Sequence, residues 1–339
     1  MNSEPTNEEW LKLYDAALKF KAIEAWNWMY DDYLFGVQNP EDGEIGYCTV
    51  LGALGEVFGL IVYMGQNGLK SYLTIASNPE NMEDNVLIQD CLSATYDDRK
   101  YIDKKDMAII KKLGLNFRGK NAYPLFRRYK PNYYPWYLTG DECRFLTIAL
   151  EQAAYACIEV KDDESFLPDV FDTGYCLVRY FEDDKWKDKQ SRIDTGEEKR
   201  KITIQTNELK LACIKKKSVK SEGKWEIGFF VNSTMPIKEK ERPYFPIVML
   251  MVDSISGHVF NAYLSEPSDY YQNIFDNFVE FIEKTGVIPQ EIFVEKDDLQ
   301  TILYPATAAL GIKLTKVKKC RMFKEAQRGL LGFGRRLMR

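Results

Sequence analysis

The longest apolar stretch of the chain is the eight-residue run FPIVMLMV at residues 245–252. It is too short to cross a membrane, which takes about 18 consecutive apolar residues, but it has the length of a β-strand. A strand without alternating polar residues is covered on both of its faces. The run therefore predicts a central strand, packed against other elements above and below its sheet.

The residues after this run give a readable order of elements. A turn at 254–257 leads to a second strand, and Tyr271, Phe275, Phe278 and Ile282 then recur at helical spacing before Gly286. The predicted strands are 259–264, 291–295 and 312–317, and the predicted helices are 269–285, 298–311 and a last one from about 321. The C-terminal part is thus expected to be hairpin-α-β-α-β-α.

The length of 339 residues suggests two domains. The N-terminal part mixes strands and helices as well, beginning with a helix over 6–23, where Thr6 and Glu9 have the spacing of a capping box. Charged residues and Pro168 mark a break near 162–168. We expect an α+β protein with domains at 1–165 and 166–339, each a mixed or antiparallel sheet with packed helices. The charge-rich segment 182–200 is expected to be a mobile loop.

Targeting signals and cysteine use indicate a cytoplasmic protein. The N-terminus, MNSEPTNEEW, has neither the basic nor the apolar region of a secretory signal, and nothing points to a membrane. Seven cysteines are scattered without a CxxC pair, which is typical of reduced thiols in a cytosolic protein. The net charge of −5 indicates no general attraction to polyanions.

Catalytic signatures are few. The single histidine, His258, cannot form a zinc site that needs two or three histidines, and it lies at a predicted turn. The sequence has no nucleophile elbow, phosphate loop or dinucleotide fingerprint. We therefore expect a non-enzymatic binding or interaction protein with no cofactor.

Residues 121–137 combine seven aromatic residues, three prolines and the cations Arg127, Arg128 and Lys130. Proline removes backbone donors and fixes φ, so this segment is expected to be extended or looped. One interpretation is a nucleic-acid platform of stacking rings and phosphate-binding arginines. The other, which we favour, is an aromatic strap packed across a domain surface.

Charge is distributed unevenly along the chain. Residues 299–339 hold ten Lys or Arg and one acidic residue, Glu325, whereas the rest holds 36 basic and 50 acidic residues. Lys316 and Lys318 share one face of the predicted last strand. This stretch is a candidate surface for a nucleic acid or an acidic protein partner. The alternative is an intramolecular match with the acidic remainder.

Several motifs resemble a bacterial family, common in Firmicutes, that is made of two adjacent domains of unknown function. They are WLKLY at 10–14, WNWM at 26–29, YCTVLG at 47–52, GLIVYMG at 59–65, YKP at 129–131 and YPW at 134–136. The resemblance covers most of the chain. It implies no activity, cofactor or catalytic residue.

The C-terminal third, within 245–325, also resembles the ribonuclease-H-like core of integrases and transposases. The resemblance implies acidic residues that bind Mg²⁺ or Mn²⁺ and make the protein a nuclease. On the assumption that 245–252 is the first strand, Asp253 ends the first strand, at 245–252, and takes the first position, and Glu295, with Asp297 and Asp298 nearby, takes the second. The third strand of that core is not evident, and Glu325 is the acidic residue on the last helix.

Overall fold

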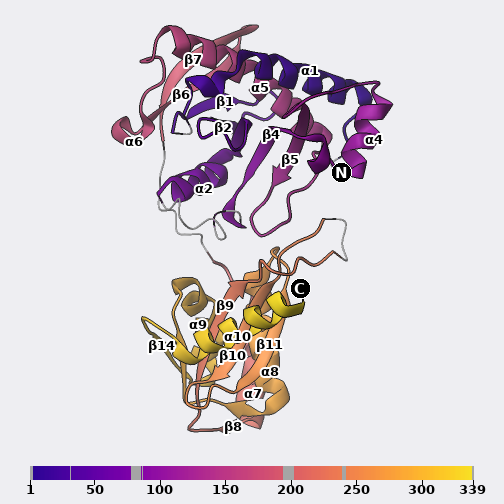
Figure 1. Cartoon of the computed structure of the whole chain (residues 1–339). Coiled ribbons are helices and arrows are strands. Elements are labelled where there is room, and N and C mark those ends of the chain that lie inside the picture. The colour runs from indigo at the N-terminus through magenta and orange to yellow at the C-terminus, as the bar shows by residue number, and fades with distance from the viewer. Residues whose placement is uncertain are drawn as a thin grey trace. The chain divides into compact units, whose positions relative to one another are not determined.

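The computed structural model describes residues 3–30, 32–77, 85, 87–193, 202–238 and 242–337, with the side chains of the last helix described up to residue 332. The chain forms two compact units, Met1–Pro131 with Pro135–Gly196, and Asn132–Tyr134 with Glu197–Arg339. Figure 1 shows the elements of each unit. Both combine helices with sheets, which confirms the predicted α+β class.

The first unit is built on a seven-stranded sheet in the order β5-β4-β3-β2-β1-β6-β7. Only the β1–β6 pair among these is parallel. Its elements are α1 (Asn7–Ile23), β1 (Phe35–Gln38), β2 (Ile45–Leu51), β3 (Gly59–Met64), α2 (Gly65–Ser77), β4 (Cys91–Asp97), α4 (Lys104–Lys112), β5 (Tyr123–Tyr129), α5 (Gly140–Asp162), α6 (Val170–Thr173), β6 (Tyr175–Glu182) and β7 (Lys185–Arg192), with 3₁₀ turns at Ala25–Asn27 and Arg99–Tyr101.

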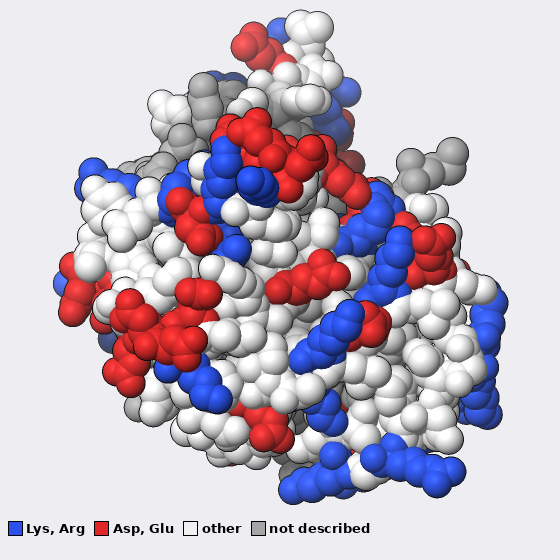
Figure 2. Space-filling view, turned by 90° about the horizontal axis from the view of Figure 1, so that it is seen from above, with Lys and Arg blue, Asp and Glu red and all other residues white. Residues whose placement is uncertain are grey.

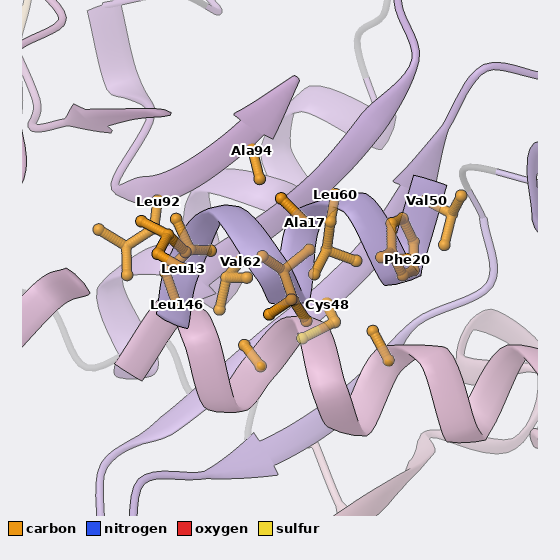
Figure 3. Close-up of a cluster of buried hydrophobic side chains, with 14 of the residues drawn as sticks. Leu13, Ala17, Phe20, Cys48, Val50, Leu60, Val62, Leu92, Ala94 and Leu146 are labelled. Carbon is orange, nitrogen blue, oxygen red and sulfur yellow. The ribbon is translucent and has the colours of Figure 1, made fainter. Parts of the chain in front are cut away.

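Helices α1 and α5 run side by side over one face of this sheet (Figure 1). Both start with a capping box, Thr6 with Glu9 and Thr139 with Glu142, as the sequence predicts for the first helix. Figure 3 shows the resulting core, where Leu13 of α1 and Leu146 of α5 lie near Val62 and Leu92 of the sheet, and Phe20 of α1 lies near Val50. On the other face, α2 packs Leu69 and Tyr72 against Tyr47 and Tyr63.

The boundary between the units lies later than the expected 165/166, because residues 175–192 complete the first sheet. Strand β6 pairs with β1, from Phe35↔Leu177 to Val37↔Arg179, and β7 pairs with β6 along its full length. The expected mobile loop at 182–200 is therefore wrong for its first part, which forms β7 after a turn at Asp183 and Asp184. The rest of that loop, from 194, lies outside the described residues.

The second unit is built on a five-stranded sheet in the order β11-β10-β9-β13-β14. Strands β9, β10 and β11 are antiparallel, and β13 and β14 run parallel to β9. The elements are α7 (Glu208–Lys217), β8 (Val219–Lys220), β9 (Lys224–Val231), β10 (Ile247–Asp253), β11 (Val259–Ser265), α8 (Tyr270–Thr285), β12 (Val287–Ile288), β13 (Glu291–Val294), α9 (Asp297–Leu310), β14 (Lys313–Lys316) and α10 (Arg321–Leu337).

The predicted central strand is β10, which is buried from Ile247 to Val252. Its residues alternate between two cores, with Met249 and Met251 facing α7, α8 and α9, and Val248 and Leu250 facing α10. The predicted order hairpin-α-β-α-β-α is confirmed from β10 onward. In chain order, however, β10 is the second strand of this sheet and not the first. Strand β9 precedes it in the sequence and pairs with both β10 and β13.

Candidate anion-binding surface

Helix α10 lies on the face of the second sheet opposite α8 and α9, across β9 and β10 (Figure 1). Its apolar side packs Phe323 against Phe230 and Val248. Directly beneath the Phe323 ring is Gly228 of β9, where a Cβ atom would lie 2.4 Å from the nearest ring carbon. A glycine in this strand is therefore what lets the helix approach the sheet.

Two carboxylates from the sheet hold the N-terminus of α10. The residue before the helix is Cys320, whose thiol is a poor substitute for an N-cap hydroxyl or carboxylate. Instead, the Phe323 N–H donates to Glu226 Oε2 at 2.8 Å, and the Cys320 N–H donates to Glu295 Oε1 at 2.5 Å. These are the two hydrogen bonds of a capping box, supplied here by β9 and by the residue after β13.

The charges at this helix end are balanced locally. Burial raises the pKa of Glu226, and the nearby Glu295 acts in the same direction, while hydrogen bonds from the backbone of Arg321, Met322 and Phe323 oppose the rise. Lys324 Nζ lies 3.5 Å from Glu295. Burial also raises the pKa of the Cys320 thiol to about 12, so this thiol is protonated at neutral pH and a weak nucleophile.

Docking the apolar side of α10 leaves Arg321 and Arg328 exposed and Lys324 half-exposed. Arg321, Lys324 and Arg328 recur at i, i+3 and i+7, which places them on one side of the helix. Together with Lys318 and Lys319 of the preceding loop they form what we call the basic surface. Four of the five are exposed, and within the described part of the chain only Lys324 is in an ion pair. Glu325 is the one acidic residue between them.

The two units carry opposite net charges. Residues 197–339 contain 24 basic and 18 acidic residues, a net +6, whereas the remaining residues contain 22 basic and 33 acidic, a net −11. Several cations of the first unit are in ion pairs, as with Arg144, which contacts Glu9, Glu41 and Asp141 at 2.7 Å. Acidic and basic side chains lie next to one another on the face shown in Figure 2.

The structure separates the two lysines predicted as partner-binding residues. Lys316, at the end of β14, forms an ion pair with Asp297 of α9 at 2.5 Å. Lys318 is exposed in the loop before α10 and belongs to the basic surface. Lys318 is therefore better placed than Lys316 to contact an anion.

Each predicted metal-binding carboxylate already has protein partners. Asp253 accepts hydrogen bonds from Ser256 N–H and Oγ–H in the turn after β10, at 2.7 and 2.8 Å, and these bonds lower its pKa. Asp298, in the first turn of α9, accepts from the Tyr271 hydroxyl at 2.9 Å. Glu295 holds α10, as described above.

Sheet geometry also keeps Asp253 away from Glu295. Asp253 pairs with Trp225, whose ring packs against Phe281 of α8, whereas Glu295 is on the α10 side. From the strand pairing, their backbones are two strands and three residues apart, roughly 14 Å. Among the described residues, no group of three or more His, Cys, Asp or Glu is arranged to hold a metal ion.

Arg127 and Arg128 lie on β5 and are engaged within the first unit. Arg127 Nη2 contacts Asp106 at 2.6 Å and Asp103 at 3.0 Å, and Arg128 contacts Asp90 at 2.5 Å and Glu142 at 3.2 Å. Both guanidinium groups are mostly buried. They therefore serve as internal ion-pair partners rather than as an open phosphate site.

The aromatic segment 121–137 is extended, as expected. Its first half is β5, whose alternate residues Pro124, Phe126 and Arg128 are buried. Residues Asn132–Tyr134 belong to the second unit, where Tyr133 pairs with Tyr244. Most of these rings are half-buried, in keeping with the strap interpretation.

Sequence reasoning missed Glu226, the carboxylate that anchors α10. The available signal was a single acidic residue inside the apolar strand segment WEIGFFV, since a buried carboxylate in a strand needs a nearby donor. Of the seven cysteines, six are buried and Cys213 is exposed, and all are free thiols.

Comparisons with known proteins identify domains and assign no activity. A domain of unknown function, DUF7309, matches residues 10–179, and a second one, DUF6930, matches residues 210–331. No curated protein and no solved structure matches the chain. Across the described residues, no helix is both long and apolar enough to span a bilayer.

Proposed function

Because the chain belongs to the family of the domain of unknown function DUF7309, which carries no assigned activity, we propose its function from the site: it is a non-enzymatic protein that binds nucleic acid through the basic surface of its second unit. The observation that carries this proposal is the row of Arg321, Lys324 and Arg328 on the outer side of α10, next to exposed Lys318 and Lys319.

The spacing of these cations suits a phosphate backbone. Arg321 and Arg328 are seven residues apart on a helix, so their Cα atoms are about 10 Å apart along the axis. Phosphate contacts of this kind give affinity without reading sequence, and each one releases counterions from the nucleic acid. The rigid docking of α10 through Glu226, Glu295 and Gly228 supports the proposal, because it fixes where the cations lie.

The competing explanation is that the basic surface meets the acidic first unit of the same chain. The test therefore uses the full chain, with fluorescence anisotropy of labelled single-stranded and duplex oligonucleotides between 50 and 200 mM salt. Binding should weaken steeply with salt. For duplex DNA, replacing Arg321, Lys324 and Arg328 by Gln should reduce the slope of log K against log salt by about 2.7.

A matched control removes the same charge elsewhere. Lys12, Lys19 and Lys111 are exposed on α1 and α4 of the first unit, and their joint replacement by Gln should leave binding nearly unchanged. The proposal fails if the wild type does not bind, if binding is insensitive to salt, or if this control loses as much affinity as the α10 variant. Binding of acidic peptides but not of oligonucleotides would point to an acidic protein partner instead.

The nuclease alternative has less support. In the strand order β11-β10-β9-β13-β14, β9 would be the first strand of a ribonuclease-H-like core and β11 the third, which supports that resemblance. The chemistry is not, because Asp253, Asp298 and Glu295 are engaged with other partners. Adding Mg²⁺ or Mn²⁺ to the binding assay covers this alternative: cleavage that disappears in Asp253→Asn or Glu226→Gln would replace the binding proposal.

The proposed setting is the cytosol of a bacterium. The free thiols of the described cysteines support a reducing compartment. The bacterial origin rests on the resemblance of the sequence motifs described above.

A further inference from the structure

The strands at the edges of the two large sheets differ in how they are protected from pairing with another chain. An exposed edge strand offers unpaired backbone groups, and charged residues or proline usually protect it. Strand β5 carries Pro124 and two arginines, β7 carries four basic residues, and β14 begins and ends with lysine. Strand β11, with the sequence VFNAYLS, has neither a charge nor a proline over seven residues.

The side chains of β11 itself carry no charge on either face. Nearby charges are Asp276 and Glu280 of α8 and Glu266, and burial together with these carboxylates raises the pKa of Tyr263. On the α8 side, Asn261 donates to Asn277 at 2.8 Å, and Ser265 accepts from Asn273 at 3.0 Å. On the α10 side, Val259, Ala262 and Leu264 are exposed, and Leu264 has 57% of its surface open to solvent. Ile255, in the turn before β11, is 84% exposed. We call β11 together with Ile255 the β11 edge.

Within the described part of α10, Lys324 faces away from this edge. Lys324 points toward Glu295, on the β13 side of the helix. On the opposite side of α10 is Met322, whose sulfur lies 3.3 Å from the position of a Cβ at Gly257, in the turn that contains Ile255. The β11 side of α10 therefore adds an apolar residue to the edge, and Lys324 lies on the other side.

We propose that the β11 edge is a self-association surface, where β11 pairs antiparallel with β11 of a second copy around a two-fold axis. Charge argues for a second copy over a charged partner. The side chains of the strand itself carry no charge that would select an acidic or basic strand, and an uncharged strand opposes itself without repulsion. A closed two-fold pairing satisfies the open backbone groups of both copies at once.

The pairing joins two five-stranded sheets into one of ten strands. A seven-residue strand is about 24 Å long, and Leu264, Val259 and Ile255 are covered on the α10 side as the copies meet. Because the axis is perpendicular to the joined sheet, both α10 helices lie on the same side of it. Self-association does not depend on anion binding, so each can fail without the other.

The test measures the mass of the full chain in solution by sedimentation equilibrium over a range of concentrations. The wild type should form dimers, and Ala262→Lys should shift the equilibrium to monomer by placing two lysines against each other at the centre of the pairing. Ala262 is exposed, so the lysine meets no buried neighbour. Leu264→Lys should have the same effect, and circular dichroism verifies that both variants are folded.

The control adds the same charge to another edge strand. Gln190 is exposed on β7, and Gln190→Lys should leave the dimer intact. Hydrogen exchange provides an independent measurement without any substitution: amides of 259–265 should become more protected as concentration rises, and those of 313–316 on β14 should not. A monomeric wild type, or a dimer that both β11 variants leave unchanged, would overturn the proposal.

Discussion

Gly228→Ala tests whether close contact with the sheet fixes α10 in place. The added Cβ would lie 2.4, 2.5 and 2.7 Å from three carbons of the Phe323 ring. Ordinary contact between carbons begins near 3.5 Å, so the ring or the whole helix must move outward by about 1 Å. The ring has little freedom, since Phe323 is buried against Phe230 and Val248.

Overpacking of this kind typically costs about 1–3 kcal/mol. Phe323→Ala alone removes the ring at a cost of about 3–5 kcal/mol. In the Phe323→Ala background the extra methyl group has room, and alanine is favoured over glycine inside a strand by about 0.5–1 kcal/mol. The two substitutions should therefore be strongly coupled, with an interaction energy of about 2–3 kcal/mol.

Native-state hydrogen exchange is the suitable assay because it reports on each unit separately. Five of the six tryptophans are in the first unit, so fluorescence would follow mainly that unit. The opening free energy of the amides in β10 should be lower in Gly228→Ala than in the wild type. It should be higher in the double variant than in Phe323→Ala. Additivity of the two substitutions within about 0.5 kcal/mol would refute the reasoning, because independent sites behave in that way.

Two further predictions concern charged groups. Glu226→Gln keeps an acceptor for the Phe323 N–H and removes a carboxylate whose pKa is raised above the ordinary 4.5. A raised folded pKa means that the folded state binds the proton more tightly than the unfolded state does. The stability of the wild type should therefore fall relative to this variant as pH rises from 4.5 through the raised value, and then stay constant. A pH series of urea midpoints for both proteins checks this, and two parallel curves would contradict it. Arg127→Met leaves Asp106 buried without its cation and should destabilise the first unit by about 3–5 kcal/mol. The affinity for oligonucleotides should stay unchanged. A fall in affinity with unchanged thermal stability would restore the nucleic-acid platform interpretation of residues 121–137.

Local patterns were sufficient for much of the fold. The capping box of Thr6 and Glu9 and the continuous apolar run of β10 depend on residues close together in sequence, and the structure has both features. The C-terminal order of strands and helices follows from the same kind of evidence, because periodicity and turn residues report on a segment without reference to the rest of the chain.

Pairing between distant segments was not accessible in this way. Residues 185–192 are rich in charge and were expected to form a loop, but an edge strand exposed to solvent tolerates charge and is even protected by it. The expected domain boundary at 165/166 lies too early for a related reason. Strand β6 joins the first sheet through its parallel pairing with β1, about 140 residues earlier in the chain. Parallel strands are joined by a long connection and not by a tight turn, so no turn motif in the sequence indicates their pairing.

The candidate site shows the same division. The sequence by itself determined that the last 41 residues are basic, that the single histidine excludes several metal sites and that the core is divided between two units of strands and helices. Only the tertiary structure decided which charges remain available, because an ion pair depends on what another segment brings within a few ångströms. Arg127, Arg128 and Lys316 meet carboxylates far away in the sequence, Glu226 and Glu295 meet the end of a helix, and Arg321 and Arg328 are left facing outward.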